Sequence, residues 1–245
     1  MHRKWSTLKG LKANFSTFFN QITEKPLFFE CELCLEPDNS RLGICDECAA
    51  RLPFSGLCCP QCSEPVTTEG RCGACQRKPP DFDYSSCSLM YAHPLTHWIH
   101  RCKDRNDTRQ IPRFTALMQQ APPLFGLSPD IVTCIPASRR RLLSRGFNLS
   151  AELAAPVADY LELPFIPGLL SKTRHTEKRG ANAKERSSNP TGLSYGPVSP
   201  RGQHILIVDD VMTTGSTLNE AAAILKQQGA ITVGAWCLAR TPKTR

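Results

Sequence analysis

The sequence predicts an α/β fold, a parallel sheet with helices on both faces, preceded by a small cysteine-rich module. Near the C-terminus, residues 205–208 are apolar and mostly β-branched, which is typical of a buried strand. A helical pattern of apolar residues follows from Leu218 to Leu225, and residues 231–239 predict a second strand after Gly229. The cysteine-rich module is indicated by four Cys-x-x-Cys pairs within residues 31–75.

Length and composition agree with this organisation. A chain of 245 residues, 40% of them hydrophobic, has room for one full α/β domain and a small module. No apolar run approaches the roughly 18 residues of a membrane span. Residues 1–30 have neither the continuous apolar core nor the cleavage site of a secretory signal. We therefore expect a cytoplasmic protein without a membrane span.

The cysteine pairs predict metal binding, because disulfides are rare in cytoplasmic proteins. Two pairs complete one closed tetrahedral zinc site, so the sequence predicts two structural zinc ions. The predicted ligands are Cys31, Cys34, Cys45, Cys48, Cys59, Cys62, Cys72 and Cys75. The spacing leaves open whether neighbouring or alternate pairs share a metal, and Cys58 is the spare thiol. The formal charge of +8 falls to about +4 with two tetrathiolate sites, so charge alone does not argue for nucleic acid.

Residues 1–30 carry apolar side chains at nearly helical spacing with basic residues between them. This pattern predicts an N-terminal amphipathic helix, which could lie on a membrane or on a partner. Packing on the protein itself is the commoner role of such a helix, and we favour it.

The first part of the α/β domain shows weaker signals. Three histidines between residues 93 and 100 are interpreted as ordinary surface or packing residues, and residues 103–107 as a polar turn. The expected elements are a strand over 84–91, a helix over 95–102, a helix over 113–124 and a buried strand over 131–135.

A basic stretch over residues 137–148 follows the strand that Pro136 ends, and we expect a loop there. Ligands of parallel sheets gather beyond the carboxyl ends of the strands. Arginines at that edge can hold a highly charged phosphate group, and the alternative is a solvated basic face. The residues that would bind the phosphates are Arg139, Arg140 and Arg145. A helix over 149–161, bent at Pro156, is expected next.

The central motif runs from strand to helix as Asp209-Asp210-Val211-Met212-Thr213-Thr214-Gly215-Ser216-Thr217. Unpaired backbone N–H groups at a helix start favour an anion, most naturally a phosphate. The two carboxylates would repel that phosphate, so they suit the hydroxyls of a sugar. Neither a P-loop nor a dinucleotide-binding glycine motif is present. The motif therefore predicts a site for a phosphorylated sugar.

This stretch resembles the phosphoribosyl pyrophosphate (PRPP) signature of type I phosphoribosyltransferases, Asp-Asp-x-x-Thr-Thr-Gly-x-Thr after an apolar strand. The resemblance implies transfer of phosphoribose from PRPP, with Mg²⁺, to an unknown base or other acceptor. Asp209 and Asp210 would be the catalytic carboxylates on the ribose, and the arginines would face the pyrophosphate. The PRPP-binding residues implied are Val208, Asp209, Asp210, Thr213, Thr214, Gly215, Ser216 and Thr217.

The cysteine pairs, a Pro-x-x-x-Arg-Arg…Arg-Gly-Phe-Asn stretch and the PRPP signature together resemble the ComF/GntX family. That family fuses a double-zinc ribbon to a type I phosphoribosyltransferase domain. The resemblance covers roughly residues 31–240 and implies a double zinc ribbon over 31–80 and a phosphoribosyltransferase domain over 81–245, which the amphipathic helix predicted over 1–30 precedes. It also implies a role in natural competence, or in nucleotide salvage from imported DNA.

Residues 171–203 are polar, without apolar periodicity, and we expect a flexible loop there. The family pattern of this loop is matched by Arg174, Thr176, Arg186 and Asn189. Arg179 stands where the family usually has glutamine, which puts contacts to the second substrate in doubt.

Two functions stay open at this point. One is an enzyme that transfers phosphoribose. The other is a non-catalytic PRPP or nucleotide sensor, a partner of DNA-uptake or recombination proteins that contacts single-stranded DNA.

Overall fold

The structure of the protein, a computed structural model, describes residues 30–37, 42–123, 128–172 and 192–243. The chain forms two compact units, Met1–Arg51 and Leu52–Arg245. The helix predicted over residues 1–30 falls almost entirely outside the described residues. The domain limits predicted at residues 30 and 80 stay a prediction.

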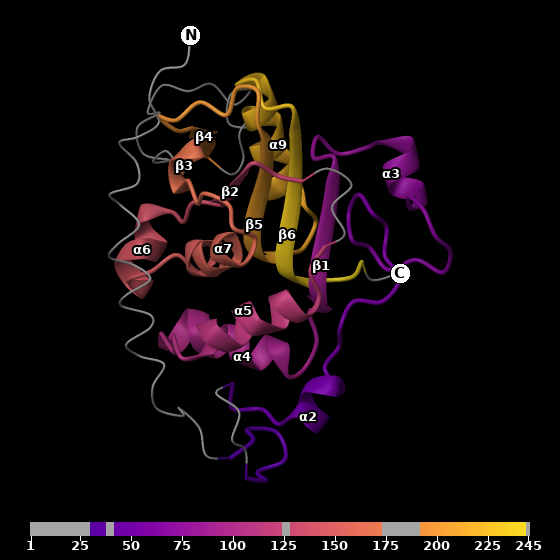
Figure 1. Ribbon diagram of the computed structural model, residues 1–245, viewed down its shortest axis with the longest axis vertical. Coiled ribbons are helices and arrows are strands. Elements are labelled where there is room, and N and C mark those ends of the chain that lie inside the picture. The colour runs from indigo at the N-terminus through magenta and orange to yellow at the C-terminus, as the bar shows by residue number, and fades with distance from the viewer. Residues whose placement is uncertain (1–29, 38–41, 124–127, 173–191, 244–245) are drawn as a thin grey trace. The chain divides into compact units, whose positions relative to one another are not determined.

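Four parallel strands form the main sheet in the order β1-β6-β5-β2 (Figure 1). Their bounds are Tyr84–Met90 for β1, Ile131–Cys134 for β2, His204–Met212 for β5 and Thr232–Arg240 for β6. The two central strands, β5 and β6, are the longest, because each has a partner on both edges. This arrangement confirms the predicted parallel sheet.

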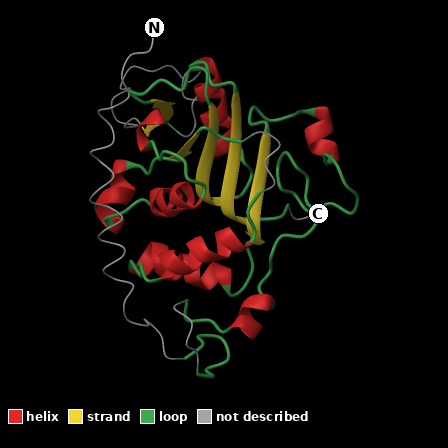
Figure 2. Cartoon of the chain, viewed as in Figure 1, coloured by secondary structure: helices red, strands yellow, loops and turns green. Residues whose placement is uncertain are grey.

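Helices cover both faces of this sheet (Figure 2). On one face, α5 packs on β6 and α7 packs on β5 and β2, while α4 packs on α5. The apolar stripe of α9, which includes Leu218, Ala222 and Leu225, packs on the other face against Ile207 and Ala235. The bounds are Leu95–Arg105 for α4, Gln110–Gln120 for α5, Leu149–Tyr160 for α7 and Ser216–Gln227 for α9.

Several elements differ from the sequence-based expectation. Helix α4 continues to Arg105, into the polar turn predicted over 103–107, and α5 (Gln110–Gln120) begins and ends earlier than the helix predicted over 113–124. The strand predicted over 205–208 extends to Met212, because β6 continues to pair with it as far as the register Met212↔Arg240. The loop predicted over 137–148 contains a helix, α6 (Arg139–Arg145). Ser138 caps this helix by accepting a hydrogen bond from the Arg141 backbone N–H at 3.4 Å, and Gly146 ends it at φ 79°.

A small antiparallel sheet lies between α7 and β5 in the chain. It pairs β3 (Leu170–Lys172) with β4 (Leu193–Tyr195), and the 3₁₀ helix η2 (Pro167–Leu169) precedes it. The loop predicted over 171–203 therefore contains the end of β3 and the whole of β4, and its residues 173–191 lie outside the described residues.

The cysteine-rich module contains two short helices, α2 (Asp46–Ala50) and α3 (Gly73–Arg77). Of the helices in the described ranges, none has the length and apolar character needed to cross a bilayer.

Candidate functional site

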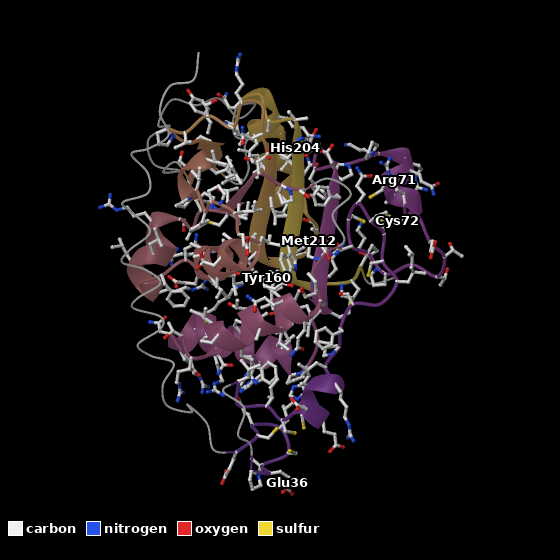
Figure 3. All side chains as sticks on the ribbon, in the orientation of Figure 1. Glu36, Arg71, Cys72, Tyr160, His204 and Met212 are labelled. Atoms are coloured by element: carbon white, nitrogen blue, oxygen red, sulfur yellow. The ribbon has the colours of Figure 1, made fainter. Side chains whose placement is uncertain are left out.

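The candidate site lies at the carboxyl edge of the sheet, where β5 ends. Met212 is the last residue of β5 and His204 the first, and both are labelled in Figure 3. Asp209 and Asp210 lie near the carboxyl end of this central strand, and Val208 is buried immediately before them. Ligands of open parallel sheets bind at this edge.

The carboxylate of Asp209 has a strongly perturbed pKa. The hydroxyl of Ser150, at the start of α7, donates a hydrogen bond to Asp209 Oδ1 at 2.6 Å. Burial, and then the neighbouring charge of Asp210, raise the pKa of Asp209 to about 7. A half-buried carboxylate with so high a pKa is a functional-site signal, because the protein holds a charge there at a cost in stability.

Asp210 points to a different partner, because adjacent residues of a strand face opposite sides of a sheet. Its Oδ2 atom lies 2.8 Å from the ammonium of Lys103, in the last turn of α4. The two side chains are only 22% and 18% exposed, so the ion pair is largely screened from solvent. Asp210, one of the two carboxylates predicted to bind the ribose, is therefore already paired with a lysine in this structure.

The loop between β5 and α9 presents hydroxyl groups at a helix start. Gly215 adopts φ 79°, which a residue with a Cβ rarely does, and α9 begins at Ser216. The Thr214 hydroxyl donates to Ser216 Oγ at 3.0 Å and accepts from the Ser216 N–H at 3.3 Å. The cavity below this loop measures about 30 Å³, room for about one water. The side chains of Thr213, Thr214 and Ser216 are exposed.

The predicted pyrophosphate-binding arginines lie on α6, which follows β2. The register Cys134↔Val208 places the end of β2 beside the acidic pair. Arg145 lies 3.8 Å from Asp104 on α4, whereas Arg139 and Arg140 are exposed in the first turn of α6. The structure thus brings Arg145 to the α4 turn that carries Lys103.

Asn148, the last residue of the Arg-Gly-Phe-Asn stretch, has a structural role in this arrangement. Its side-chain amide donates to the backbone carbonyl of Ile135 at 2.9 Å. This bond ties the start of α7, and with it Ser150, to the end of β2.

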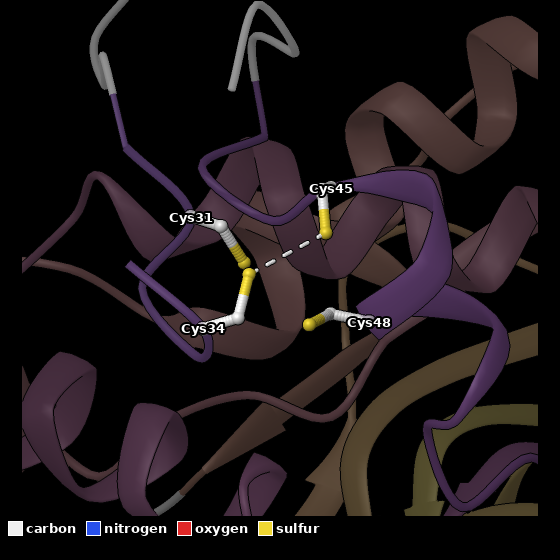
Figure 4. A group of neighbouring side chains, drawn as sticks. All are labelled: Cys31, Cys34, Cys45 and Cys48. Atoms are coloured by element: carbon white, nitrogen blue, oxygen red, sulfur yellow. Dashed lines mark hydrogen bonds between the residues drawn. The ribbon is translucent and has the colours of Figure 1, made fainter. Parts of the chain in front are cut away.

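Four of the predicted metal ligands gather in the first unit (Figure 4). They are Cys31, Cys34, Cys45 and Cys48, whose sulfur atoms all lie within 4.8 Å of one another. The Cys34 and Cys45 sulfurs are 3.8 Å apart, close to the separation of about 3.8 Å expected for two sulfurs on one tetrahedral zinc with Zn–S bonds of about 2.3 Å. Burial opposes ionisation, but backbone N–H groups, first that of Cys45, lower the pKa of Cys31 to about 6.

The other four gather in the second unit in the same way. They are Cys59, Cys62, Cys72 and Cys75. Cys62 and Cys72 sulfurs are 3.6 Å apart, and the Cys72 N–H donates to Cys59 Sγ at 3.3 Å. Neighbouring pairs therefore share a site, which answers the question that the spacing left open. Cys58 belongs to neither group.

The two groups repeat one design. Each first pair is followed by a residue of positive φ, Leu35 or Ser63, and each second pair begins a short helix, α2 or α3. Both sets fit a closed zinc site by composition and spacing, with four thiol ligands and no open position.

Several residues of this edge escaped the sequence analysis. Lys103 and Ser150 are polar residues far from the motif in sequence, so only the fold brings them to it. Arg240 carries a signal that could have been used, since it is a charged residue ending an otherwise apolar strand. The predicted loop residues Arg174, Arg186 and Asn189 lie outside the described residues.

Known proteins resemble the chain in sequence. Residues 144–245 match the phosphoribosyl transferase domain family. The chain is 34% identical over 219 residues to the DNA utilization protein YhgH of Shigella flexneri, covering 86% of this chain and 96% of that protein. It is 30% identical over 210 residues to Competence protein F of Haemophilus influenzae, covering 81% of this chain and 90% of the relative. The solved structure of glutamine PRPP amidotransferase from B. subtilis, complexed with ADP and GMP, aligns with a TM-score of 0.38 and 21% identity over 51% of this chain and 25% of that one.

Proposed function

Because the chain belongs to the ComF-like family of phosphoribosyltransferase-domain proteins, we propose that it binds PRPP at the carboxyl edge of its sheet and transfers the phosphoribosyl group to a base or similar nucleophile. One observation carries this proposal. Two adjacent carboxylates, Asp209 with its raised pKa and Asp210, stand immediately before a hydroxyl-rich loop that opens α9. A ribose 5-phosphate requires this combination. The carboxylates accept hydrogen bonds from the ribose hydroxyls, and the N–H groups of the loop donate to the phosphate.

The residues divide the work as follows. Residues 213–217 bind the 5′-phosphate through backbone N–H groups and hydroxyls, and Asp209 and Asp210 accept from the ribose hydroxyls. Ser150 holds Asp209 in place through its hydrogen bond of 2.6 Å. When the bond from ribose C1 to pyrophosphate breaks, the negative potential of the carboxylates stabilises the positive charge that develops on the sugar.

The departing pyrophosphate needs positive charge. Arg145 and Lys103 stand on the two elements nearest this side of the site, α6 and the last turn of α4. In the absence of ligand Lys103 pairs with Asp210, and we propose that PRPP replaces this pair, the ribose taking Asp210 and the diphosphate taking Lys103. Mg²⁺ carried by the diphosphate would add charge neutralisation, and the carboxylate oxygens nearby suit a hard cation.

We further propose that the two cysteine groups each hold one structural zinc ion. Thiolates at this spacing leave no open coordination position, so the metal would stabilise the fold and take no part in the transfer.

A screen for pyrophosphate release tests the transfer reaction. Wild-type protein with Mg²⁺-PRPP is offered purine and pyrimidine bases one at a time, and the Asp209→Asn, Asp210→Asn double variant is the matched control. We expect release with one class of base in the wild type and none in the variant. Tight PRPP binding without release for any base would favour the sensor function instead.

The printed names of two relatives, a DNA utilization protein and a competence protein, favour a second candidate, contact with single-stranded DNA. Residues 135–186 carry ten Lys and Arg against five Asp and Glu. Neutralising DNA phosphates releases counterions, so binding should weaken steeply as salt is raised. A flat salt response, or no binding at low ionic strength, would leave the small-molecule function alone.

A further inference from the structure

Arg240 is a buried cation at the last position of β6, with 1% of its surface exposed. Its neighbours in register are Met90 of β1 and Met212 of β5, so it lies at the carboxyl edge of the sheet. A buried guanidinium is stable only when its donors are paired. Its partners therefore show which parts of the protein this side chain holds together.

On one side Arg240 contacts the turn of the second cysteine group. Its Nη2 atom donates to Glu64 Oε2 at 2.6 Å, and its Nε atom donates to the backbone carbonyl of Cys62 at 3.1 Å. The same turn is closed by the Cys59 N–H, which donates to the Glu64 carbonyl at 2.8 Å. Two predicted ligands of one zinc ion, Cys59 and Cys62, thus belong to the turn that Arg240 binds.

On the other side Arg240 contacts the start of the loop over residues 213–217, the phosphate loop. Its Nη1 atom donates to the backbone carbonyl of Met212 at 3.1 Å and also to those of Thr213 and Thr241. Thr213 is the first residue of the loop proposed to bind the 5′-phosphate. One planar side chain therefore joins the cysteine turn to the phosphate loop, and its fixed fork makes the connection geometrically specific.

A second connection runs parallel to the first. The Gln61 side chain, between the two cysteines of the same turn, donates to the Phe82 carbonyl at 3.4 Å. The Phe82 ring lies 3.8 Å from where a Cβ on Gly215 would stand. The same turn is attached to β1, because the Ser85 N–H donates to the Pro60 carbonyl at 3.0 Å. The cysteine turn thus reaches the phosphate loop at Thr213, through Arg240, and beside Gly215, through Phe82.

We propose that Arg240 is a positioning residue through which metal in the second cysteine group (Cys59, Cys62, Cys72 and Cys75) sets the conformation of the phosphate loop. The metal fixes the Cys59–Glu64 turn, Arg240 transmits that geometry to Met212 and Thr213, and the loop hydroxyls are held ready for the phosphate. The ligand part of this inference rests on the proposed function. The conformational part does not.

Linkage provides the test, because a metal that favours the phosphate loop must itself be bound more tightly when that loop is occupied. The two zinc affinities of the full chain are measured by competition with a chromogenic chelator, with and without saturating Mg²⁺-PRPP. We expect PRPP to tighten one zinc by about fivefold or more. Cys34→Ser, which removes a ligand of the first group, should leave this tightening in place. Arg240→Lys, which keeps the charge and loses the fork, should reduce it to less than twofold, and Glu64→Gln to an intermediate value.

A readout without ligand is amide hydrogen exchange of residues 213–217. Chelating zinc from the second group should speed this exchange by about tenfold in the wild type and add little in Arg240→Lys. Val157→Ala, a core change in α7, is the control for general destabilisation and should leave the local exchange unchanged. If wild type binds no PRPP yet the exchange depends on zinc, the proposed function fails and the coupling stands. If PRPP binds but neither zinc affinity nor loop exchange responds, the coupling is wrong.

Discussion

Replacing Asp209 by Asn should make the unliganded protein more stable and its ligand binding weaker. Burial and Asp210 raise the pKa of Asp209 from its ordinary 3.8 to about 7. A raised pKa means that the folded state holds the proton more tightly than the unfolded state, so stability falls as pH rises from about 4 to 7. At 1.36 kcal/mol per pH unit, the charged side chain would cost up to about 4 kcal/mol above pH 7.

Asn removes the charge and keeps an oxygen that can accept from Ser150. We therefore expect Asp209→Asn to raise the free energy of unfolding by roughly 2–4 kcal/mol at pH 8, with the gain fading as pH approaches 4. Urea titrations at pH 8, 6 and 4.5 measure this difference. Asp159→Asn, at an exposed position of α7, is the control and should change little at any of these pH values. Lower stability of Asp209→Asn at pH 8, or a difference that does not depend on pH, would refute the reasoning.

Three further outcomes follow from the structure. Metal analysis should find two zinc ions per chain, and Cys31→Ser and Cys72→Ser should each lose one; zinc-free protein with eight freely reactive thiols would contradict the metal assignment. Gly234→Ala should destabilise by about 1–3 kcal/mol in urea, because a Cβ there would stand 2.0 Å from the Tyr84 ring, whereas Gly56→Ala has open space and should be neutral. Lys103→Met should destabilise by about 1–3 kcal/mol by leaving Asp210 unpaired, and adding Asp210→Asn should recover most of that loss; additive losses would exclude the ion pair.

The sequence predicted most of the sheet because its signals there are local. β-branched runs mark β5 and β6, and Gly229 at φ 94° follows the predicted helix α9. The length of β5 was underestimated because two carboxylates interrupt its apolar pattern, while pairing with β6 carries the strand on to Met212. Helix α6 was missed because its basic residues resemble a solvated loop. Its cap residues, Ser138 and Gly146, were the available signal.

The candidate site was only partly predictable for a related reason. The acidic pair and the hydroxyl loop are contiguous in sequence, so the motif identifies them together. The residues that support them are distant in sequence. Ser150 lies 59 residues from Asp209, and Glu64 lies 176 residues from Arg240. Such contacts depend on how helices and turns meet the sheet edge, which periodicity does not encode.

Calorimetric titration with Mg²⁺-PRPP tests the central claim most directly. Losing a charged hydrogen bond to a ribose hydroxyl costs roughly 1.5–3 kcal/mol, about tenfold to a hundredfold in affinity. The account predicts measurable binding by the wild type and at least tenfold weaker binding by the Asp209→Asn, Asp210→Asn double variant, with the variant still folded. Equal affinities in the two proteins would contradict the assignment of this sheet edge as the PRPP site.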